Sequence, residues 1–576
     1  MQSRSTCKAG ASYGHCLGRL LHGCFGNLSQ LGARFGIHLT LEQWYRQYGP
    51  IYKFFLGRAP VVVVTDPDLL KQLCTKSFMK FHDRPDLQMR LSEGREISDE
   101  GMLAAKGRYW TGLRAACEPV FHSDKLQSYV PITNTALTSL IQKLDAVQAD
   151  GPVEINLALA GMTMDVIGAS AFGVNFKAQE DASSTIVQHA LDVFRPPSGA
   201  SFTLIRDILV TFPFLVPVMS FVMSFTRLPR VTQVVGARRF IKGASESLLR
   251  NARAEGKPNS SSLAAPVPDT VDSGVQCNSF AHKLTLWMQA PAHQIFTQAV
   301  KQGRQEYAQQ VPRDQSLLHN LMAARRKDTG QPLSDLQICA QAFIFILAGY
   351  ETTSMALTYT LYELARHPDI QQRVVQEVER FGREQEPQYA DLAHFPLIDA
   401  VLKEGMRLHP PVTPLIALTC EATDDVMLGQ YHIPAGTRIW INVRSLHLDD
   451  KHFTNAKDFV PDRFLEGEGQ GWHHPYVYLP FGAGPRKCIG YRMQGSGNFS
   501  SHLDETCMFC LVQCGSAAPS ARWYGWQAAC IVDTEPKSRS NCRQDYFTVG
   551  PKVPLRHYRF DNIPPQSGFS PQSPRV

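Results

Sequence analysis

The first thirty residues lack a long apolar run of the kind that anchors proteins to membranes. Lys8 and Arg19 lie in this stretch, and little of it is continuously apolar. A membrane span needs about 20 predominantly apolar residues in a row. We therefore expect residues 1–44 to form an N-terminal segment without a clear anchor.

An excess of one charge and an ordered cysteine spacing are also missing. The 58 basic and 52 acidic residues give a net charge of +6 without long charge runs, which argues against a nucleic-acid partner. Fourteen cysteines follow no repeating framework, so we expect reduced thiols rather than disulfides. No Gly-x-Gly-x-x-Gly fingerprint precedes a helix, so no dinucleotide-binding domain is expected. With 44% hydrophobic and 19% charged residues, the 576-residue chain has a globular composition.

Helix signals outnumber strand signals and predict a mainly α protein with a minor β region in a single large domain. The run from Ser334 to Gln337 is a capping box that starts a helix reaching Arg366, and His367-Pro368 ends it. Further helices are predicted within 110–172 and at 368–381 and 396–408, and strands at 51–56, 60–64, 431–433 and 437–443, with a hairpin turn at Gly57-Arg58.

Two segments lack both patterns. Residues 208–225 carry no charge but contain Pro213 and Pro217. A membrane span is conceivable there, yet two short helices are favoured, with an apolar face that lines a substrate entrance or contacts a bilayer surface. Residues 257–274 are rich in Ser, Pro and Ala, which predicts a disordered loop.

The run Phe-Gly-Ala-Gly-Pro-Arg-Lys-Cys-Ile-Gly, residues 481–490, places one cysteine in a glycine-rich loop. A loop that leads into a helix stabilises a thiolate at Cys488 through free N–H groups and the positive end of the helix dipole. Phe481 offers a flat face for a flat cofactor, and Arg486 offers positive charge to its carboxylates. These features indicate a heme-iron thiolate site, and a buried free cysteine is the alternative.

This run resembles the heme-binding signature of the cytochrome P-450 family, Phe-x-x-Gly-x-Arg-x-Cys-x-Gly, at every specified position. The resemblance covers about residues 45–490 and implies the family's mainly α fold, one heme b, and Cys488 as the axial ligand. An anionic thiolate ligand favours O–O bond cleavage. The resemblance further implies insertion of one atom of O₂ into an apolar substrate, with electrons from NADPH through a separate flavoprotein reductase.

Residues 348–354, Ala-Gly-Tyr-Glu-Thr-Thr-Ser, lie inside the long predicted helix and resemble the family's oxygen-activation motif. Glycine in a helix interior costs about 1 kcal/mol relative to alanine, so we interpret Gly349 as allowing close approach to the cofactor. The hydroxyl of Thr352 can bond to its own backbone and leave a local opening. Glu351 and Thr352 together can relay protons. The alternative is a contact between helices that requires small residues.

Glu404 and Arg407 lie three residues apart on one face of a predicted helix. An isolated surface pair of this kind is worth only about 0.5 kcal/mol. In the resembled family, the arginine of the Pro-Asp-Arg-Phe motif, here Arg463, joins such a pair in a buried triad. The resemblance therefore implies that Glu404, Arg407 and Arg463 are structural and hold the loop of Cys488.

Trp110 and Arg114 lie one helical turn apart and resemble the family's pair that binds one heme propionate, while Arg486 would bind the other. A packing or surface pair is the alternative. The place of a further propionate-binding arginine in the family is taken here by Leu418.

Residues 491–576 depart from the family, which continues after the cysteine into a long helix behind the heme. Here the sequence from Tyr491 to Asn498 is a poor helix former. Cys507 and Cys510 form a Cys-x-x-Cys without a matching second pair, so zinc binding is a weak alternative. Because residues 547–556 resemble the family's final strand region again, we interpret this segment as an atypical, mis-annotated insertion.

The motifs together favour a heme-thiolate monooxygenase, and residues 343–354 and 164–168 resemble the branch of animal steroid and drug oxidases and plant oxidases of carotenoid-derived hormones. One rival is a heme-binding protein without monooxygenase activity, such as a sensor or degenerate product. Another is a heme-thiolate isomerase or dehydratase, a kind that tends to lose the acid–threonine pair. Many family members carry an N-terminal anchor, which would imply the endoplasmic reticulum or a plastid; without one we expect the cytoplasm.

Overall fold

The computed structural model describes residues 25–32, 37–85, 97, 99–147, 154–180, 185–194, 207–216, 218, 229–255, 316–382, 387–412, 418–465, 474–493 and 499–501. The chain divides into two units, residues 1–531 and 532–576, and every described residue belongs to the first. The loop predicted at 257–274, the Cys507 and Cys510 pair, and residues 547–556 lie outside the described residues.

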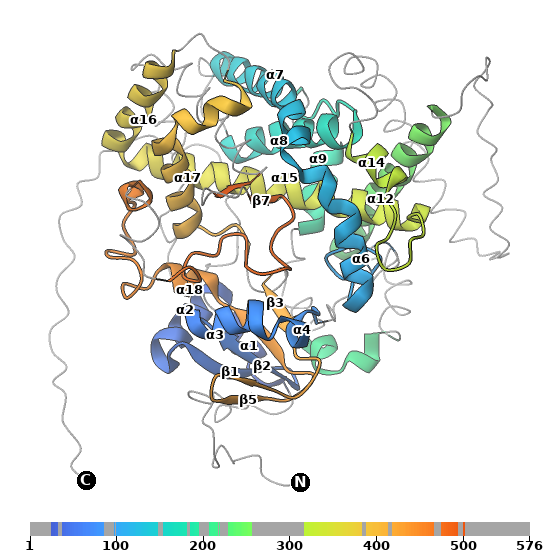
Figure 1. The fold of residues 1–576 in the computed structure, drawn as a ribbon, viewed down its shortest axis with the longest axis vertical. Coiled ribbons are helices and arrows are strands. Elements are labelled where there is room, and N and C mark those ends of the chain that lie inside the picture. Colours follow the sequence, from blue (N-terminus) through green and yellow to red (C-terminus); the bar gives the residue numbers. More distant parts are fainter. Residues whose placement is uncertain are drawn as a thin grey trace, which may run out of the picture. The chain divides into compact units, whose positions relative to one another are not determined.

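Helices account for most of the described elements (Figure 1). The α-helices are α1 (Leu28–Gly32), α2 (Ile37–Tyr48), α3 (Pro67–Lys71), α4 (Phe78–Phe81), α6 (Gly107–Cys117), α7 (Ser123–Val147), α8 (Ile155–Phe172), α9 (Thr185–Phe194), α12 (Pro229–Glu255), α14 (Leu317–Ala323), α15 (Asp335–Arg366), α16 (Pro368–Phe381), α17 (Pro396–Leu408) and α18 (Val443–His447). Between them lie the π-helical turn η3 (Gln72–Lys76) and the 3-10 turns η4 (Glu118–Phe121), η5 (Pro213–Leu215), η7 (Tyr389–His394) and η8 (Pro461–Phe464).

The long helix α15 begins and ends where the sequence predicts. Ser334 Oγ accepts the backbone N–H of Gln337, and the Gln337 side chain accepts the N–H of Ser334, which completes the capping box. The helix ends at His367 because Pro368 disfavours helical geometry in the residue before it.

The core of the helical part forms around α15. This helix packs against α8 and α17, and α12 packs against α9. Side chains of α8 and α15 share two hydrophobic clusters, which also include residues of α12 and α17. Among the described residues, α8 and α15 are long and apolar enough to cross a membrane, but 78% and 61% of their apolar windows is buried. Such burial is typical of core helices.

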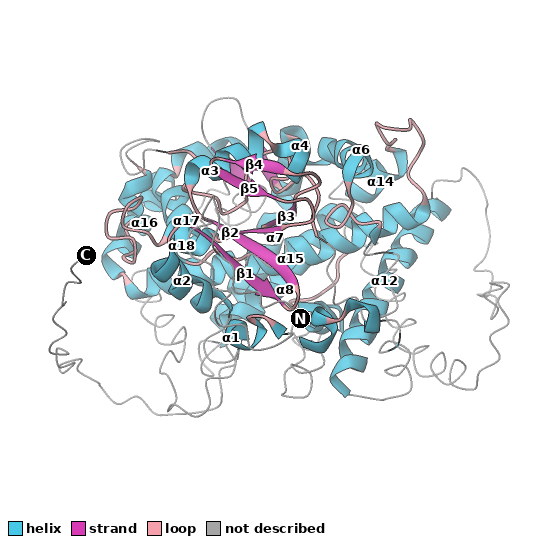
Figure 2. Ribbon diagram, turned by 90° about the horizontal axis from the view of Figure 1, so that it is seen from below, coloured by secondary structure: helices cyan, strands magenta, loops and turns pink. Residues whose placement is uncertain are grey.

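The β region lies at one end of the described unit, as Figures 1 and 2 show. Its main sheet has the order β1-β2-β6-β3, in which β1 pairs antiparallel with β2, β2 parallel with β6, and β3 antiparallel with β6. A hairpin of β4 and β5 lies apart from this sheet. The bounds are β1 (Ile51–Leu56), β2 (Ala59–Val64), β3 (Thr419–Glu421), β4 (Val426–Leu428), β5 (Tyr431–Ile433) and β6 (Arg438–Ile441).

The valine run of β2 shows why this sheet is stable. Val61 and Val63 contact the cluster that includes Trp44 of α2, whereas Val62 and Val64 contact the cluster beneath the opposite face. Successive strand residues point to opposite faces, so a strand covered on both sides is apolar throughout.

The predicted fold class is confirmed: the chain is mainly helical with a small sheet region. The predicted β1–β2 hairpin is also confirmed, with Gly57 in the left-handed region at φ +61°. The strand predicted at 437–443 is shorter, because the Asn442 side chain accepts the N–H of Ser445 and caps α18.

After Cys488 the chain forms a strand. β7 (Tyr491–Met493) pairs antiparallel with β8 (Phe499–Ser501), and in the described part of the chain no helix follows the cysteine. Residues 491–493 are thus not helical, as their sequence predicts, and residues 494–498 lie outside the described residues. The expectation that a helix dipole supports the Cys488 thiolate is wrong for the part that the structure describes.

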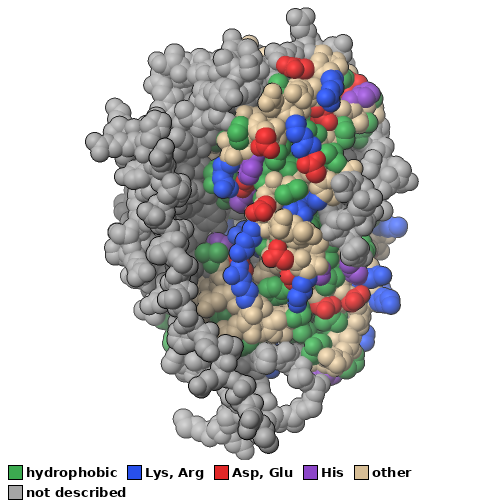
Figure 3. All heavy atoms as spheres, turned by 90° about the vertical axis from the view of Figure 1, so that its left-hand side faces the viewer, with side chains coloured by type: hydrophobic (Ala, Val, Ile, Leu, Met, Phe, Trp, Pro, Cys, Tyr) green, Lys and Arg blue, Asp and Glu red, His purple; other side chains and the backbone are tan. Residues whose placement is uncertain are grey.

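The surface charges are mixed. On the face drawn in Figure 3, Lys and Arg side chains alternate with Asp and Glu side chains. This distribution differs from the continuous basic stripe that is typical of nucleic-acid binding.

Candidate active site

Cys488 lies in a tight loop that is seated against η3. Its backbone N–H donates to Phe481 O at 3.0 Å, and Lys487 N–H donates to Gly484 O at 3.0 Å. Gly484 has φ +68°, and a Cβ there would lie 2.1 Å from the carbonyl oxygen of Cys74. A side chain at this position is therefore excluded by both conformation and space.

Cys488 differs from the other cysteines that the structure describes. It is exposed, whereas Cys74, Cys117, Cys339 and Cys420 are buried. Burial raises the pKa of Cys74, Cys117 and Cys339 to about 12 in each case. The alternative of a buried, inert cysteine at position 488 is thus contradicted by its exposure.

Three guanidinium groups gather around this loop. Arg114 Nη1 donates to Lys487 O at 2.7 Å. Burial lowers the pKa of Arg84 to about 10, and the nearby charges of Cys420 and Cys488 oppose that shift. Burial and the neighbouring charge of Arg84 lower the pKa of Arg486 to about 9. Mutual repulsion of this kind shows that the three cations lie close together.

Arg486 and Trp110 connect the loop to the preceding segment. Arg486 donates from Nε to His82 O at 2.8 Å and from Nη2 to Ala105 O at 2.7 Å. Its guanidinium carbon lies 4.2 Å from the ring centroid of Trp110, a cation–π contact. Trp110 and Arg114 both project from α6 toward the loop, since each contacts a residue of it.

The sequence reasoning missed Arg84. It lies in an irregular stretch just before Pro85, and no motif or helical spacing distinguishes it. Leu418, at the place of a family arginine, is instead buried in an apolar cluster, with its Cδ2 3.4 Å from where a Cβ of Gly482 would be.

Helix α15 is continuous through the predicted oxygen-activation motif. Ala348 is exposed although Leu347 and Tyr350 beside it are buried. Thr352 Oγ1 donates to Ala348 O at 2.6 Å, the backbone hydrogen bond that the sequence predicts. Glu351 is half-buried on the same helix.

Gly349 serves close packing between helices. A Cβ at this position would lie 2.8 Å from Ile167 Cδ1 of α8, which is closer than van der Waals contact allows. The alternative of a close contact between helices is therefore present, although the end of the Ile167 side chain could shift to admit a methyl group. The role of Gly349 toward the cofactor stays a prediction.

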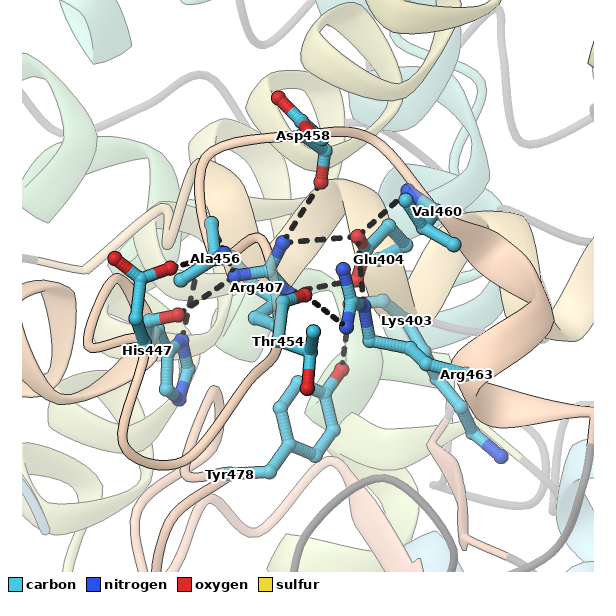
Figure 4. Close-up of polar contacts among 11 residues, drawn as sticks. Lys403, Glu404, Arg407, His447, Thr454, Ala456, Asp458, Val460, Arg463 and Tyr478 are labelled. Atoms are coloured by element: carbon cyan, nitrogen blue, oxygen red, sulfur yellow. Dashed lines mark hydrogen bonds and ion pairs between the residues drawn. The ribbon is translucent and has the colours of Figure 1, made fainter.

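The structure brings Glu404, Arg407 and Arg463 together in a buried network (Figure 4). Arg407 donates to Glu404 from Nε at 2.7 Å and from Nη2 at 2.8 Å, and Arg463 Nε donates to Glu404 Oε1 at 3.1 Å. Arg407 and Arg463 also donate to the backbone carbonyl oxygens of His447, Thr454, Ala456 and Asp458, whereas the buried Arg463 Nη2 makes no hydrogen bond to a described residue.

The donor set fits the implied cofactor. Three partly buried guanidinium groups suit a ligand with carboxylates, because cations withdrawn from water need a partner anion. The exposed thiol of Cys488 supplies a soft ligand of the kind that binds heme iron. Among the described residues, no cluster of three or more His, Cys, Asp and Glu side chains forms a site for a bare metal ion.

Fold and site together define a heme-thiolate protein, and comparison with known proteins supports this. The family model described as cytochrome P450 matches residues 18–219 and 281–494. The chain belongs to the cytochrome P450 family. It is accordingly an oxidoreductase that binds heme b and incorporates oxygen.

Several mammalian proteins are similar over most of their length. Thromboxane-A synthase of Rattus norvegicus is 29% identical over 79% of this chain and 78% of that protein. Cytochrome P450 3A41 of Mus musculus is 30% identical over 78% and 76%. Lithocholate 6-beta-hydroxylase of Mesocricetus auratus is 28% identical over 81% and 80%. The predicted resemblance to animal drug and steroid oxidases is confirmed.

Replacing Glu404 with glutamine tests the triad. The Glu404→Gln variant keeps the shape of the side chain but leaves two buried guanidinium groups without their anion, so we expect it to lower the free energy of unfolding by about 3–5 kcal/mol. The measurement is urea denaturation. Asp462→Asn is the control, because Asp462 pairs with Arg373 at the surface, where such pairs contribute about 0–1 kcal/mol. Equal losses in both variants would contradict a structural role of the triad.

Proposed function

We propose that this protein inserts one atom of O₂ into an apolar organic substrate, with electrons delivered from NADPH by a separate flavoprotein reductase. The observation that carries the proposal is the exposed Cys488 thiol beside the partly buried cations Arg84 and Arg114. When bound, heme supplies the activation of dioxygen. Basic groups such as Lys487 near the loop provide charge complementary to an acidic reductase surface.

The three arginines around the loop have two roles in the proposed function. Arg84, Arg114 and Arg486 would hold the carboxylates of heme, with Trp110 as a neighbouring N–H donor. The same positive charge favours the thiolate form of Cys488. Phe481, which packs 5.5 Å from the ring of Tyr491, would bound the cofactor with its flat face.

Glu351 and Thr352 would move protons. The Thr352 hydroxyl donates a hydrogen bond to Ala348 O. The lone pairs of Thr352 Oγ1 can therefore accept a second hydrogen bond. Glu351, one residue earlier and half-buried, would exchange protons with solvent. The intact pair favours a monooxygenase over a heme-thiolate isomerase or dehydratase.

The spectrum of the reduced, carbon monoxide-treated protein tests the thiolate. We expect the long-wavelength band of a thiolate-ligated heme in the purified chain and its complete loss in Cys488→Ala, because only a sulfur anion produces that band. Cys339→Ala is the control, since Cys339 is a buried residue of α15. Absence of the band in the wild-type chain would contradict the proposal and favour a product that has lost its activity.

Two threonine variants, compared with each other, test whether Thr352 delivers protons. In an assay with NADPH and reductase, we expect Thr352→Ala to lower the yield of product per NADPH by on the order of tenfold or more, with oxygen recovered as hydrogen peroxide. Thr353→Ala is the matched control, because Thr353 Oγ1 makes the equivalent bond to Gly349 O at 2.7 Å.

Two results of this assay would contradict the proposal. Coupled hydroxylation by Thr352→Ala would remove Thr352 from the mechanism. Turnover of a hydroperoxide without NADPH would point to an isomerase.

We also propose that the apolar segment near Phe214 contacts a bilayer surface. Phe214 and Val218 are 68% and 59% exposed. The ring of Phe212 lies 6.0 Å from Phe214 and 6.4 Å from Phe25, so these aromatic side chains form one patch. Burial of such side chains in a membrane interface is favourable.

A single charge in this patch tests membrane contact. We expect Phe214→Glu to lower the partition coefficient onto phosphatidylcholine vesicles by roughly tenfold or more, since burial of one large apolar side chain is worth about 1.5–3 kcal/mol. Met79→Glu is the control, because Met79 on α4 is 73% exposed outside this patch. An equal loss in both variants would rule out a specific surface.

A further inference from the structure

The buried triad does not bond directly to the loop that it is predicted to hold. In the described part of the chain, its hydrogen bonds to other residues end on the backbone of residues 447–460. The loop with Cys488 begins further along, after residue 473. Contacts through a further residue must therefore link the triad to the loop of Cys488.

The imidazole of His447, which lies beside Arg407 in Figure 4, makes that connection. Its Nδ1 lies 3.2 Å from Arg407 O, and its Nε2 lies 2.9 Å from the backbone nitrogen of Leu479. Because Leu479 N–H can only donate, Nε2 is the acceptor and Nδ1 carries the proton. The ring is fully buried, and burial together with the charge of Arg407 lowers its pKa to about 3. His447 is thus neutral and has a single tautomer.

The backbone of His447 strengthens the same link. Its carbonyl oxygen accepts from Arg407 Nη1 at 2.6 Å. The ring also stacks on Tyr478, with centroids 5.3 Å apart, and the Tyr478 hydroxyl donates to Lys403 O at 2.9 Å. Of two adjacent residues of the loop, Tyr478 is therefore bonded to α17 and Leu479 to His447 of α18.

From Leu479 the connection continues to the cysteine. Leu479 O accepts the N–H of Gly482 at 3.1 Å, and Phe481 O accepts the N–H of Cys488 at 3.0 Å. A shift of Leu479 would move Phe481 and with it the carbonyl oxygen that accepts the cysteine N–H.

We propose that His447 is a positioning residue for Cys488, which transmits the position of the Glu404–Arg407–Arg463 triad to the loop through its bond with Leu479. For its functional consequence this inference rests on the proposed thiolate role of Cys488. The bond itself is independent of any cofactor.

Two substitutions separate this role from simple core packing. The side-chain amide of glutamine reaches about as far as histidine Nε2, so His447→Gln keeps an acceptor for Leu479 N–H. The amide of asparagine reaches about as far as Nδ1, so His447→Asn keeps only the bond to Arg407 O. Both variants place a neutral amide in the same buried site.

Hydrogen–deuterium exchange of the Leu479 amide measures the bond directly. We expect exchange about tenfold faster in His447→Asn than in the wild type, because a buried N–H loses its acceptor. His447→Gln should stay close to the wild type. His409→Gln is the control, since His409 follows α17 directly and bonds to Glu363 at 2.7 Å rather than to the loop. Equal exchange in the Asn and Gln variants would overturn the proposal.

The carbon monoxide spectrum measures the consequence for the cysteine. At equal heme content, we expect the thiolate band of His447→Asn to decay several-fold faster than that of His447→Gln. Equal decay in the two variants would overturn the positioning role. A wild-type chain without the band would contradict the proposed function, and the exchange experiment would still decide whether the link exists.

Discussion

The fully buried carboxylate of Glu404 is the constraint on which the arrangement near Cys488 depends. A buried charge is tolerated only when its hydrogen bonds are satisfied, and this one accepts from Arg407, Arg463 and the N–H of Val460. The two guanidinium groups in turn need acceptors, and they take them from backbone carbonyls of residues 447–458. The path of a mostly irregular segment is therefore determined by charge rather than by a ladder of strand hydrogen bonds.

A second group of charged side chains lies around Cys488, and the excess of cations is larger there. Around Glu404 one anion joins two cations, whereas Arg84, Arg114 and Arg486 have Asp83, 3.9 Å from Arg486, among them. Repulsion by Arg84 and Arg114 lowers the pKa of Arg486, and repulsion by Arg114 lowers that of Arg84, in addition to burial. Bonds to backbone carbonyls satisfy the guanidinium donors but do not neutralise their charge. An anionic ligand removes this repulsion, so the site gains electrostatic stability from a dicarboxylate cofactor and from a thiolate at Cys488.

Local chemistry allowed much of the fold to be predicted, whereas contacts distant in sequence could not be. The capping box at Ser334 and the proline at 368 define α15 because they act within one helical turn. His447 and Arg84 escaped prediction because their partners lie tens to hundreds of residues away, as with Leu479 and Cys488. Histidine and arginine in an irregular segment have no periodic signal. The early end of β6 was missed because Asn442 was not recognised as a helix cap.

The strand after Gly490 changes how the support of Cys488 must be understood. A helix beginning there would hold the cysteine from its C-terminal side by its free N–H groups, but β7 uses its backbone to pair with β8. The contacts that fix the loop come instead from residues before the cysteine: Gly484 fits against the Cys74 carbonyl, and Leu479 bonds to His447. The hydrogen bond from Cys488 N–H to Phe481 O therefore joins the fixed part of the loop to the cysteine.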